Sequence, residues 1–137
     1  MTDQQQRFAA AAIKCLDTPF RLHGRSSRFG LDCVGLVIVC LAAVSKEIPH
    51  LPDYGLRNIR LNGLSKTARK AGFVPATGGV QTGDLLLVRP GPAQTHFLIA
   101  SGASAFVHAD AGLRRVVQIP GPLRWPIIRH FRLSKEP

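Results

Sequence analysis

The stretch LDCVGL, residues 31–36, opens an apolar run without charged residues that continues to Val44. Asp is a preferred N-cap residue, so the pattern predicts a helix that begins at Cys33 and is capped by Asp32. The free N–H groups and the positive dipole end of such a helix stabilise a thiolate, which is the nucleophilic form of cysteine. Cys33 is therefore a candidate nucleophile that needs a base elsewhere in the chain.

Helical periodicity dominates the first half of the sequence. Asp3 to Leu16 predicts an amphipathic helix, followed by a loop from Phe20 to Gly30, the Cys33 helix, and an irregular stretch from Ile48 to Ile59. A third helix is expected where apolar residues recur at helical spacing before Gly72, at Leu61, Leu64, Ala68 and Ala71.

Short apolar segments separated by Gly-containing turns follow in the second half. They predict strands at Leu85–Val88, His96–Ser101, Ala105–Ala109, Leu113–Ile119 and Ile127–Leu133. Because 137 residues suffice for one compact domain and not for two ordinary ones, we expect a single domain over residues 1–137. The predicted class is α+β, with the Cys33 helix packed on a five-stranded antiparallel sheet.

Two histidines on adjacent predicted strands are the candidates for the base and its partner. If residues 101–103 form a three-residue turn, His96 lies directly opposite His108; an odd loop shifted by one places them diagonally on the same face. An even loop would separate them onto opposite faces. The first two arrangements allow one histidine to deprotonate Cys33 while the other orients it.

The remaining cysteines, histidines and tryptophan have simpler interpretations. Cys15 and Cys40 are expected to be buried as small hydrophobes, and the odd cysteine count without CxxC spacing argues against a disulfide framework or a zinc site. His50 and His130 are expected on the surface. Trp125 is expected to anchor the last strand to the core.

The chain carries 18 Lys and Arg against 8 Asp and Glu, a formal net charge of +10. The basic residues are scattered from Arg7 to Lys135, which argues against a specific nucleic-acid site and is compatible with attraction to anionic cell-wall polymers. The N-terminus lacks the pattern of a secretory signal, and the apolar run from Cys33 to Val44 is shorter than the roughly 20 residues of a membrane span. We therefore expect synthesis in the cytoplasm and no membrane span.

An ordered set of motifs in this sequence resembles the NlpC family of papain-like cell-wall cysteine peptidases. The motifs, in order, are Thr18-Pro19-Phe20-Arg21 with Gly24, LDCVGL at 31–36, Gly83-Asp84-Leu85-Leu86-Leu87, His96, and Phe106-Val107-His108-Ala109. The match covers most of the chain, which looks most similar to the short forms found with phage tails and gene-transfer-agent particles.

The resemblance implies a papain-like NlpC-type fold, with Cys33 as nucleophile, His96 as general base and His108 as the orienting third residue. It implies hydrolysis of amide bonds in peptidoglycan stem peptides without a metal or cofactor. Because the N-terminus lacks the pattern of a secretory signal, we expect the protein to reach the wall only when a tail, a secretion machine or lysis carries it there. Many relatives carry Tyr at the position of Phe20, so a hydroxyl group that could bond near the nucleophile or the oxyanion is absent here. Many also carry Ser at the position of Val34, which changes the polar lining for the substrate.

Further residues are candidates for binding substrate. Asp32 combines its capping role with a carboxylate that can meet a substrate ammonium, and Phe20, Arg21 and His23 are candidates for the cleft wall. Two other functions are compatible with the same residues: a catalytically silent structural protein of a tail or baseplate, and a different thiol acyl-enzyme such as an acyltransferase or deamidase.

Overall fold

The computed structural model of the protein describes residues 2–46 and 59–134. Its helices are α1 (Asp3–Lys14), α2 (Cys33–Ala43) and α3 (Leu64–Lys70). Its strands are β1 (Arg25–Ser26), β2 (Gly30–Leu31), β3 (Phe73–Pro75), β4 (Leu85–Val88), β5 (His96–Gly102), β6 (Ala105–Asp110), β7 (Arg115–Pro120) and β8 (Ile127–Leu133). None of the helices in these two ranges is long and apolar enough to cross a membrane.

The helices begin and end close to the predicted positions. Thr2 forms a capping box with Gln5 at the start of α1, and the side chain of Asp32 accepts a hydrogen bond from Gly35 at the start of α2. Both predicted core cysteines, Cys15 and Cys40, are buried. The predicted irregular stretch 48–59 and His50 lie almost entirely outside the described residues.

The main sheet has six strands in the order β3-β8-β4-β5-β6-β7, and all its pairs are antiparallel. The five predicted strands are present, but the sheet gains β3 at its edge, so the predicted strand number was one short. Only β4 to β7 form a meander, because β8 returns to pair with β4. The predicted loop between Phe20 and Gly30 contains the short hairpin of β1 and β2.

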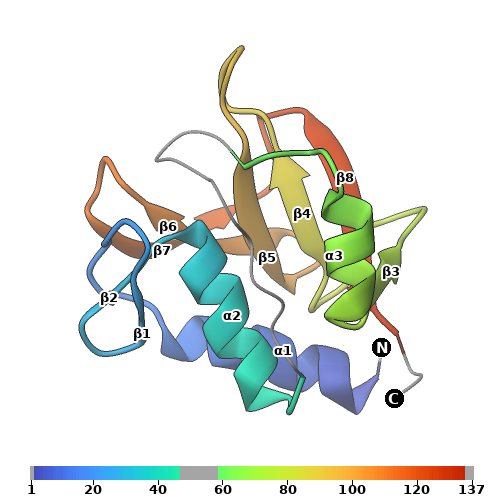
Figure 1. The fold of residues 1–137 in the computed structure, drawn as a ribbon, viewed down its shortest axis with the longest axis horizontal. Helices are drawn as coiled ribbons and strands as arrows, with labels where there is room; N and C mark the ends of the chain where they lie inside the picture. The colour runs from blue at the N-terminus through green and yellow to red at the C-terminus, as the bar shows by residue number, and fades with distance from the viewer. Residues whose placement is uncertain (1, 47–58, 135–137) are drawn as a thin grey trace.

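The sheet is apolar on both faces near its centre. Helices α1 and α2 lie on one face of the sheet (Figure 1). Their apolar side chains form one core with Leu85, Phe97, Ile99 and Val107. The alternate side chains, including Leu86, Leu98 and Phe106, form a second cluster, against which Trp125 packs. This explains why β4 reads as a continuous run of Leu and Val, a pattern typical of strands covered on both sides.

A close backbone contact ties α1 to the sheet. Gly83 has φ +89°, and a Cβ atom at this position would lie 2.4 Å from the carbonyl oxygen of Gln5. Only glycine fits such a left-handed position at this separation. Gly83 thus lets the first helix approach the residue before β4.

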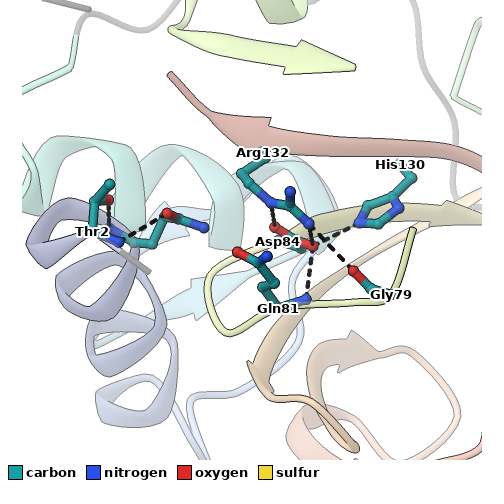
Figure 2. Close-up of polar contacts among 7 residues, drawn as sticks. Thr2, Gly79, Gln81, Asp84, His130 and Arg132 are labelled. Carbon is teal, nitrogen blue, oxygen red and sulfur yellow. Dashed lines mark hydrogen bonds and ion pairs between the residues drawn. The ribbon is translucent and has the colours of Figure 1, made fainter. Parts of the chain in front are cut away.

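The residue after this glycine is the centre of a buried polar cluster (Figure 2). Asp84 is fully buried, and its two carboxylate oxygens accept hydrogen bonds from Arg132 Nε and Nη2 at 2.8 and 2.9 Å, from His130 Nε2 at 2.6 Å and from the Gln81 amide at 2.9 Å. Burial raises the pKa of this carboxyl, but the bonds from Arg132, Gln81 and His130 outweigh it and hold the pKa below its ordinary value.

His130 was expected on the surface, and that prediction is wrong. Its side chain is only 14% exposed because its ring nitrogen is paired with Asp84. The cluster therefore fastens β8 to the turn that precedes β4 (Figure 2).

Replacing Arg132 by Leu should destabilise the fold strongly, because it leaves the buried carboxylate of Asp84 without its cation. We expect a loss of about 3 kcal/mol in the free energy of unfolding, the lower end of the range for breaking a buried ion pair. Urea unfolding followed by circular dichroism measures it. Arg129→Leu, an exposed arginine on the same strand, is the matched control. Equal effects of the two substitutions would contradict a structural role for the Asp84 cluster.

Candidate active site

A cavity of about 320 Å3 lies between the N-terminus of α2 and the strands β5 and β6. Cys33, His96 and His108 all line it, together with Phe20 and Asp32. Of the predicted site residues, Arg21 and His23 are not among the side chains that line this cavity. The size is within the range of small-molecule and peptide sites.

The N-terminal end of α2 is positioned by Asp32. This carboxylate is 2% exposed; it accepts hydrogen bonds from the backbone N–H of Gly35 and His23, both at 2.8 Å, and pairs with Arg25 Nη1 at 3.1 Å. The predicted cap is therefore confirmed, and it also binds the hairpin segment to the helix.

Glycine at position 35 is required by a close approach of two backbones. A Cβ atom there would lie 2.0 Å from the carbonyl oxygen of Gly24. The first turn of α2 consequently packs directly on the loop before β1. This contact gives a structural reason for the glycine of the 31–36 motif, and Gly24 is glycine because a Cβ atom there would lie 2.4 Å from the carbonyl oxygen of Gly30.

Phe20 reaches the cavity because the preceding segment runs along the edge of the sheet. The Phe20 amide donates to the Arg114 carbonyl at 2.8 Å, and the Asp17 amide donates to the Val116 carbonyl at 2.9 Å. The half-buried ring of Phe20 packs on the main core and lines the same cavity as Cys33. It offers the cavity an apolar wall without a hydroxyl group.

The two histidines are joined by a hydrogen bond. His96 Nε2 and His108 Nδ1 are 2.9 Å apart, and the ring planes meet at 86°. The paired residues Ile99 and Val107 define the register, which places His108 diagonally from His96 and not directly opposite. This is the second of the predicted arrangements, and a bulge between Ala100 and Gly102 produces it.

Burial keeps the reactive groups neutral. It raises the pKa of Cys33 to about 12, with a contribution from the charge of Asp32, although hydrogen bonds from the backbone of Phe97, Val34 and Cys33 act to lower it. The helix N-terminus alone predicted a stabilised thiolate, but desolvation of the half-buried thiol outweighs that effect. The Phe97 bond also puts the sulfur beside the residue that follows His96.

Burial, together with the neighbouring charge of His108, lowers the pKa of His96 to about 4. The carboxylates of Asp110 and Asp32 act in the opposite direction. His108 is also buried, which lowers its pKa, while Asp110 raises it. Both imidazoles are therefore neutral near pH 7, as a base and an uncharged orienting group require.

The cavity contains residues that the sequence analysis did not select. Trp125 stacks edge-on against His108 with ring centroids 5.8 Å apart, so it contributes to the site as well as to the core. Asp110 follows His108 by two residues, the spacing that keeps side chains on one face of a strand. That spacing was the signal available in the sequence.

The remaining lining residues outside the candidate set include Leu22, Gln94 and Thr95. Thr95 is buried and bonds through its hydroxyl to both the amide and the carbonyl of Ile59, which fixes the start of β5. Within 2–46 and 59–134, no group of three or more His, Cys, Asp or Glu side chains is arranged to hold a metal ion.

Acidification should destabilise the protein through His96. Its folded-state pKa of about 4 lies below the ordinary value of 6.5, so the unfolded chain binds more protons between these values and stability falls as pH drops from about 6.5 to 4. His96→Gln should make this fall shallower. Thermal melting across that pH range measures it, with His23→Asn, at an exposed loop position, as control. Parallel curves for wild type and His96→Gln would show that His96 does not contribute.

Comparison with known proteins places this geometry in a family. The model of the NlpC/P60 family matches residues 17–122 of the 137-residue chain, a range that includes Cys33, His96 and His108. A comparison with functionally curated proteins gave no match.

Solved structures with the same fold include NlpC2 from Trichomonas vaginalis, with a TM-score of 0.71 and 14% sequence identity, where the match covers 97% of this chain and 48% of that one. NlpC1 from the same organism has a TM-score of 0.68 and 15% identity, with 97% and 45% coverage. The P60 domain of antigen MAP1204 from M. avium subspecies paratuberculosis has a TM-score of 0.61 and 20% identity, with 95% and 93% coverage.

The chain spans about half the length of the two Trichomonas proteins and nearly all of the mycobacterial domain. At these identities the structural likeness establishes a common papain-like fold. The family match extends over most of the chain and includes both the cysteine and the histidine motifs. This chain therefore belongs to the NlpC/P60 family, whose members are generally cell-wall peptidases.

Proposed function

We propose that this protein is a cysteine peptidase that hydrolyses amide bonds in peptidoglycan stem peptides. Cys33 is the nucleophile, His96 the general base and His108 the residue that orients the base. The observation that carries the proposal is the 2.9 Å bond between His96 Nε2 and His108 Nδ1 on the wall of the cavity that Cys33 also lines.

This bond determines which nitrogen of each ring has which role. If His96 Nε2 carries a proton and donates it to His108 Nδ1, then His96 Nδ1 keeps its lone pair and can accept a proton from Cys33. His108 must then be protonated on Nε2 alone. After proton transfer, His96 is an imidazolium that still donates to His108, so the same bond serves both charge states.

The reaction starts from a neutral thiol and a neutral imidazole. His96 takes the Cys33 proton as the sulfur attacks the amide carbonyl, and the backbone N–H of Cys33 at the helix start donates to the oxyanion. The C–N bond then breaks and His96 returns the proton to the leaving amine. Water, deprotonated by His96, hydrolyses the thioester and restores the thiol.

The substrate wall in this proposal is formed by Phe20 and Asp32, while the exposed Arg21 and His23, on the segment that follows Phe20, do not line the cavity and would contact only a substrate that extends beyond it. Both oxygens of Asp32 already accept bonds from within the protein, so its second role, contact with a substrate ammonium, would use the remaining lone pairs. No cofactor takes part in the proposed reaction.

The place of action belongs to the proposal as well. We propose synthesis in the cytoplasm and delivery to the wall by a phage tail, a gene-transfer-agent particle or a secretion machine. The net charge of +10 then favours accumulation on anionic wall polymers.

Digestion of purified muropeptides, with products identified by mass spectrometry, tests the activity. Cys33→Ala and Cys33→Ser should reduce hydrolysis by roughly a thousandfold or more, and His96→Ala should be nearly as severe. His108→Asn should be milder, because its side-chain oxygen can still accept from His96.

Thermal melts of the same variants are the control. Wild-type melting with lost hydrolysis supports the assigned roles, whereas unfolding of Cys33→Ser would indicate a structural cysteine. A silent structural protein predicts no selective reaction of Cys33 with iodoacetamide at neutral pH, and an acyltransferase or deamidase predicts transfer or deamidation products in place of cleaved peptides.

Binding to the wall should depend on salt. The positive field of the chain should hold Cys33→Ala protein on purified sacculi at low ionic strength, and binding should weaken above about 0.1 M salt, where the screening length is about 10 Å. A pull-down against ionic strength measures this. Binding that is indifferent to salt would mean that recognition depends on the cavity alone.

A further inference from the structure

Asp110 is a cavity carboxylate that the proposed mechanism leaves without a role. It lies at the end of β6, two residues after His108, and lines the same cavity as Cys33 and both histidines. The two-residue spacing places Asp110 on the same face of β6 as His108. Its charge acts on both His96 and His108.

The orientation of this carboxylate is fixed by the turn that follows. Asp110 Oδ1 accepts from the backbone N–H of Gly112 at 2.8 Å and of Leu113 at 3.2 Å. These bonds engage one oxygen with the loop after β6. The carboxylate is thus held at the cavity wall independently of any substrate.

The charge of Asp110 differs from that of the other nearby carboxylate. Asp32 is paired with Arg25 at 3.1 Å, which offsets its charge. Across residues 2–46 and 59–134, the ion pairs involve other carboxylates, and no Lys or Arg is paired with Asp110. Within these ranges the carboxylate of Asp110 therefore has no ion-pair partner, and its charge acts on the histidine pair.

The two carboxylates also act on different groups. The charge of Asp32 raises the pKa of Cys33 as well as that of His96, so it opposes the thiolate while favouring the imidazolium. Asp110 raises the pKa of His96 and His108, whereas the carboxylate whose charge raises the pKa of Cys33 is Asp32. The charge of Asp110 therefore acts chiefly on the base.

We infer that Asp110 is a positioning residue of the site, whose charge stabilises the imidazolium that forms on His96 when Cys33 is deprotonated. The orienting residue His108 is neutral and buried, so it cannot supply this charge. In the part of the chain that the structure describes, the titratable groups that face His96 are His108 and Asp110 from β6 and Asp32 and Cys33 from the start of α2. This inference rests on the proposed function, because it assigns a charge to the proposed base.

The test compares Asp110→Asn with Asp17→Asn. Asn keeps the oxygen that accepts from the turn and removes only the charge. Asp17 is an exposed carboxylate with φ +71°, a conformation that Asn tolerates, so its substitution makes the same charge change away from the cavity. Asp110→Ser is a second neutral variant with an acceptor, should Asp110→Asn fail to fold.

The first readout is the rate of iodoacetamide reaction with Cys33 at pH 7, which does not require peptidase activity. Asp110→Asn should react more slowly than wild type, by about tenfold for each unit by which the substitution lowers the pKa of His96. Asp17→Asn should react like wild type, and Asp110→Glu should recover part of the rate. An unchanged rate in folded Asp110→Asn overturns the inference.

The second readout is the pH profile of kcat/KM on muropeptides. The acid limb reports protonation of His96, so Asp110→Asn should move that limb to lower pH while lowering the plateau. A different result is that Asp110→Asn changes only the KM for peptides that carry an ammonium group, with the rate of Cys33 alkylation and the pH of the acid limb as in wild type. That result would overturn the inference and assign Asp110 to substrate binding. If the wild-type protein hydrolyses no muropeptide but still reacts faster with iodoacetamide than Asp110→Asn, the proposed peptidase function is refuted and the effect of the Asp110 charge is retained.

Discussion

The N-terminal end of α2 depends on one buried carboxylate. Asp32 accepts from the helix at Gly35, accepts from the loop at His23 and pairs with Arg25 on β1, so a single side chain joins three parts of the chain. Cys33 is the next residue, and its direction follows from where the helix begins. Removing a partner of a buried carboxylate typically costs several kcal/mol of folding stability. The bonds of Asp32 therefore hold the start of α2, the loop and β1 rigidly together.

The site combines burial with reactivity in a way that a helix dipole alone does not explain. A dipole contributes at most about 2 kcal/mol in favourable partly buried geometry, whereas desolvation here raises the pKa of Cys33 to about 12. The same burial lowers the pKa of His96 to about 4. The resting pair is thus neutral, and the ion pair must form as the substrate is attacked. Nearby charges then matter most in the transition state.

Local patterns predicted the elements that carry the site. The motif at 31–36 was sufficient for the start of α2. The strand positions allowed His96 and His108 to share a face only if the loop between them was odd, and the structure shows their side chains joined by a hydrogen bond. Loop length alone left their exact register open, and a bulge near Gly102 decided it. The strand β3 was missed because it is only three residues long and ends in a proline.

Other features depend on contacts between distant residues and have no local signal. His130 differs from a surface histidine only because Asp84, 46 residues earlier, is buried beside it. The pKa of Cys33 depends on how closely β5 packs over the helix end, where the backbone of Phe97 meets the sulfur. Burial of a titratable group depends on the whole fold. The sequence therefore predicted that Cys33 and the two histidines lie together, but it did not predict their protonation states.

The distribution of charge separates two tasks of the molecule. The chain has 18 Lys and Arg residues, and none of those within residues 2–46 and 59–134 is among the side chains that line the cavity. A cation beside His96 would lower its pKa further and oppose formation of the imidazolium, so the basic residues are compatible with catalysis only outside the cavity. A positive exterior can attract an anionic polymer over a range of about 10 Å at 0.1 M salt, while the interior retains two carboxylates close to the base. Attraction to the wall and activation of the thiol thus require opposite charges, and the fold keeps them apart by placing the reactive groups where α2 meets the ends of β5 and β6.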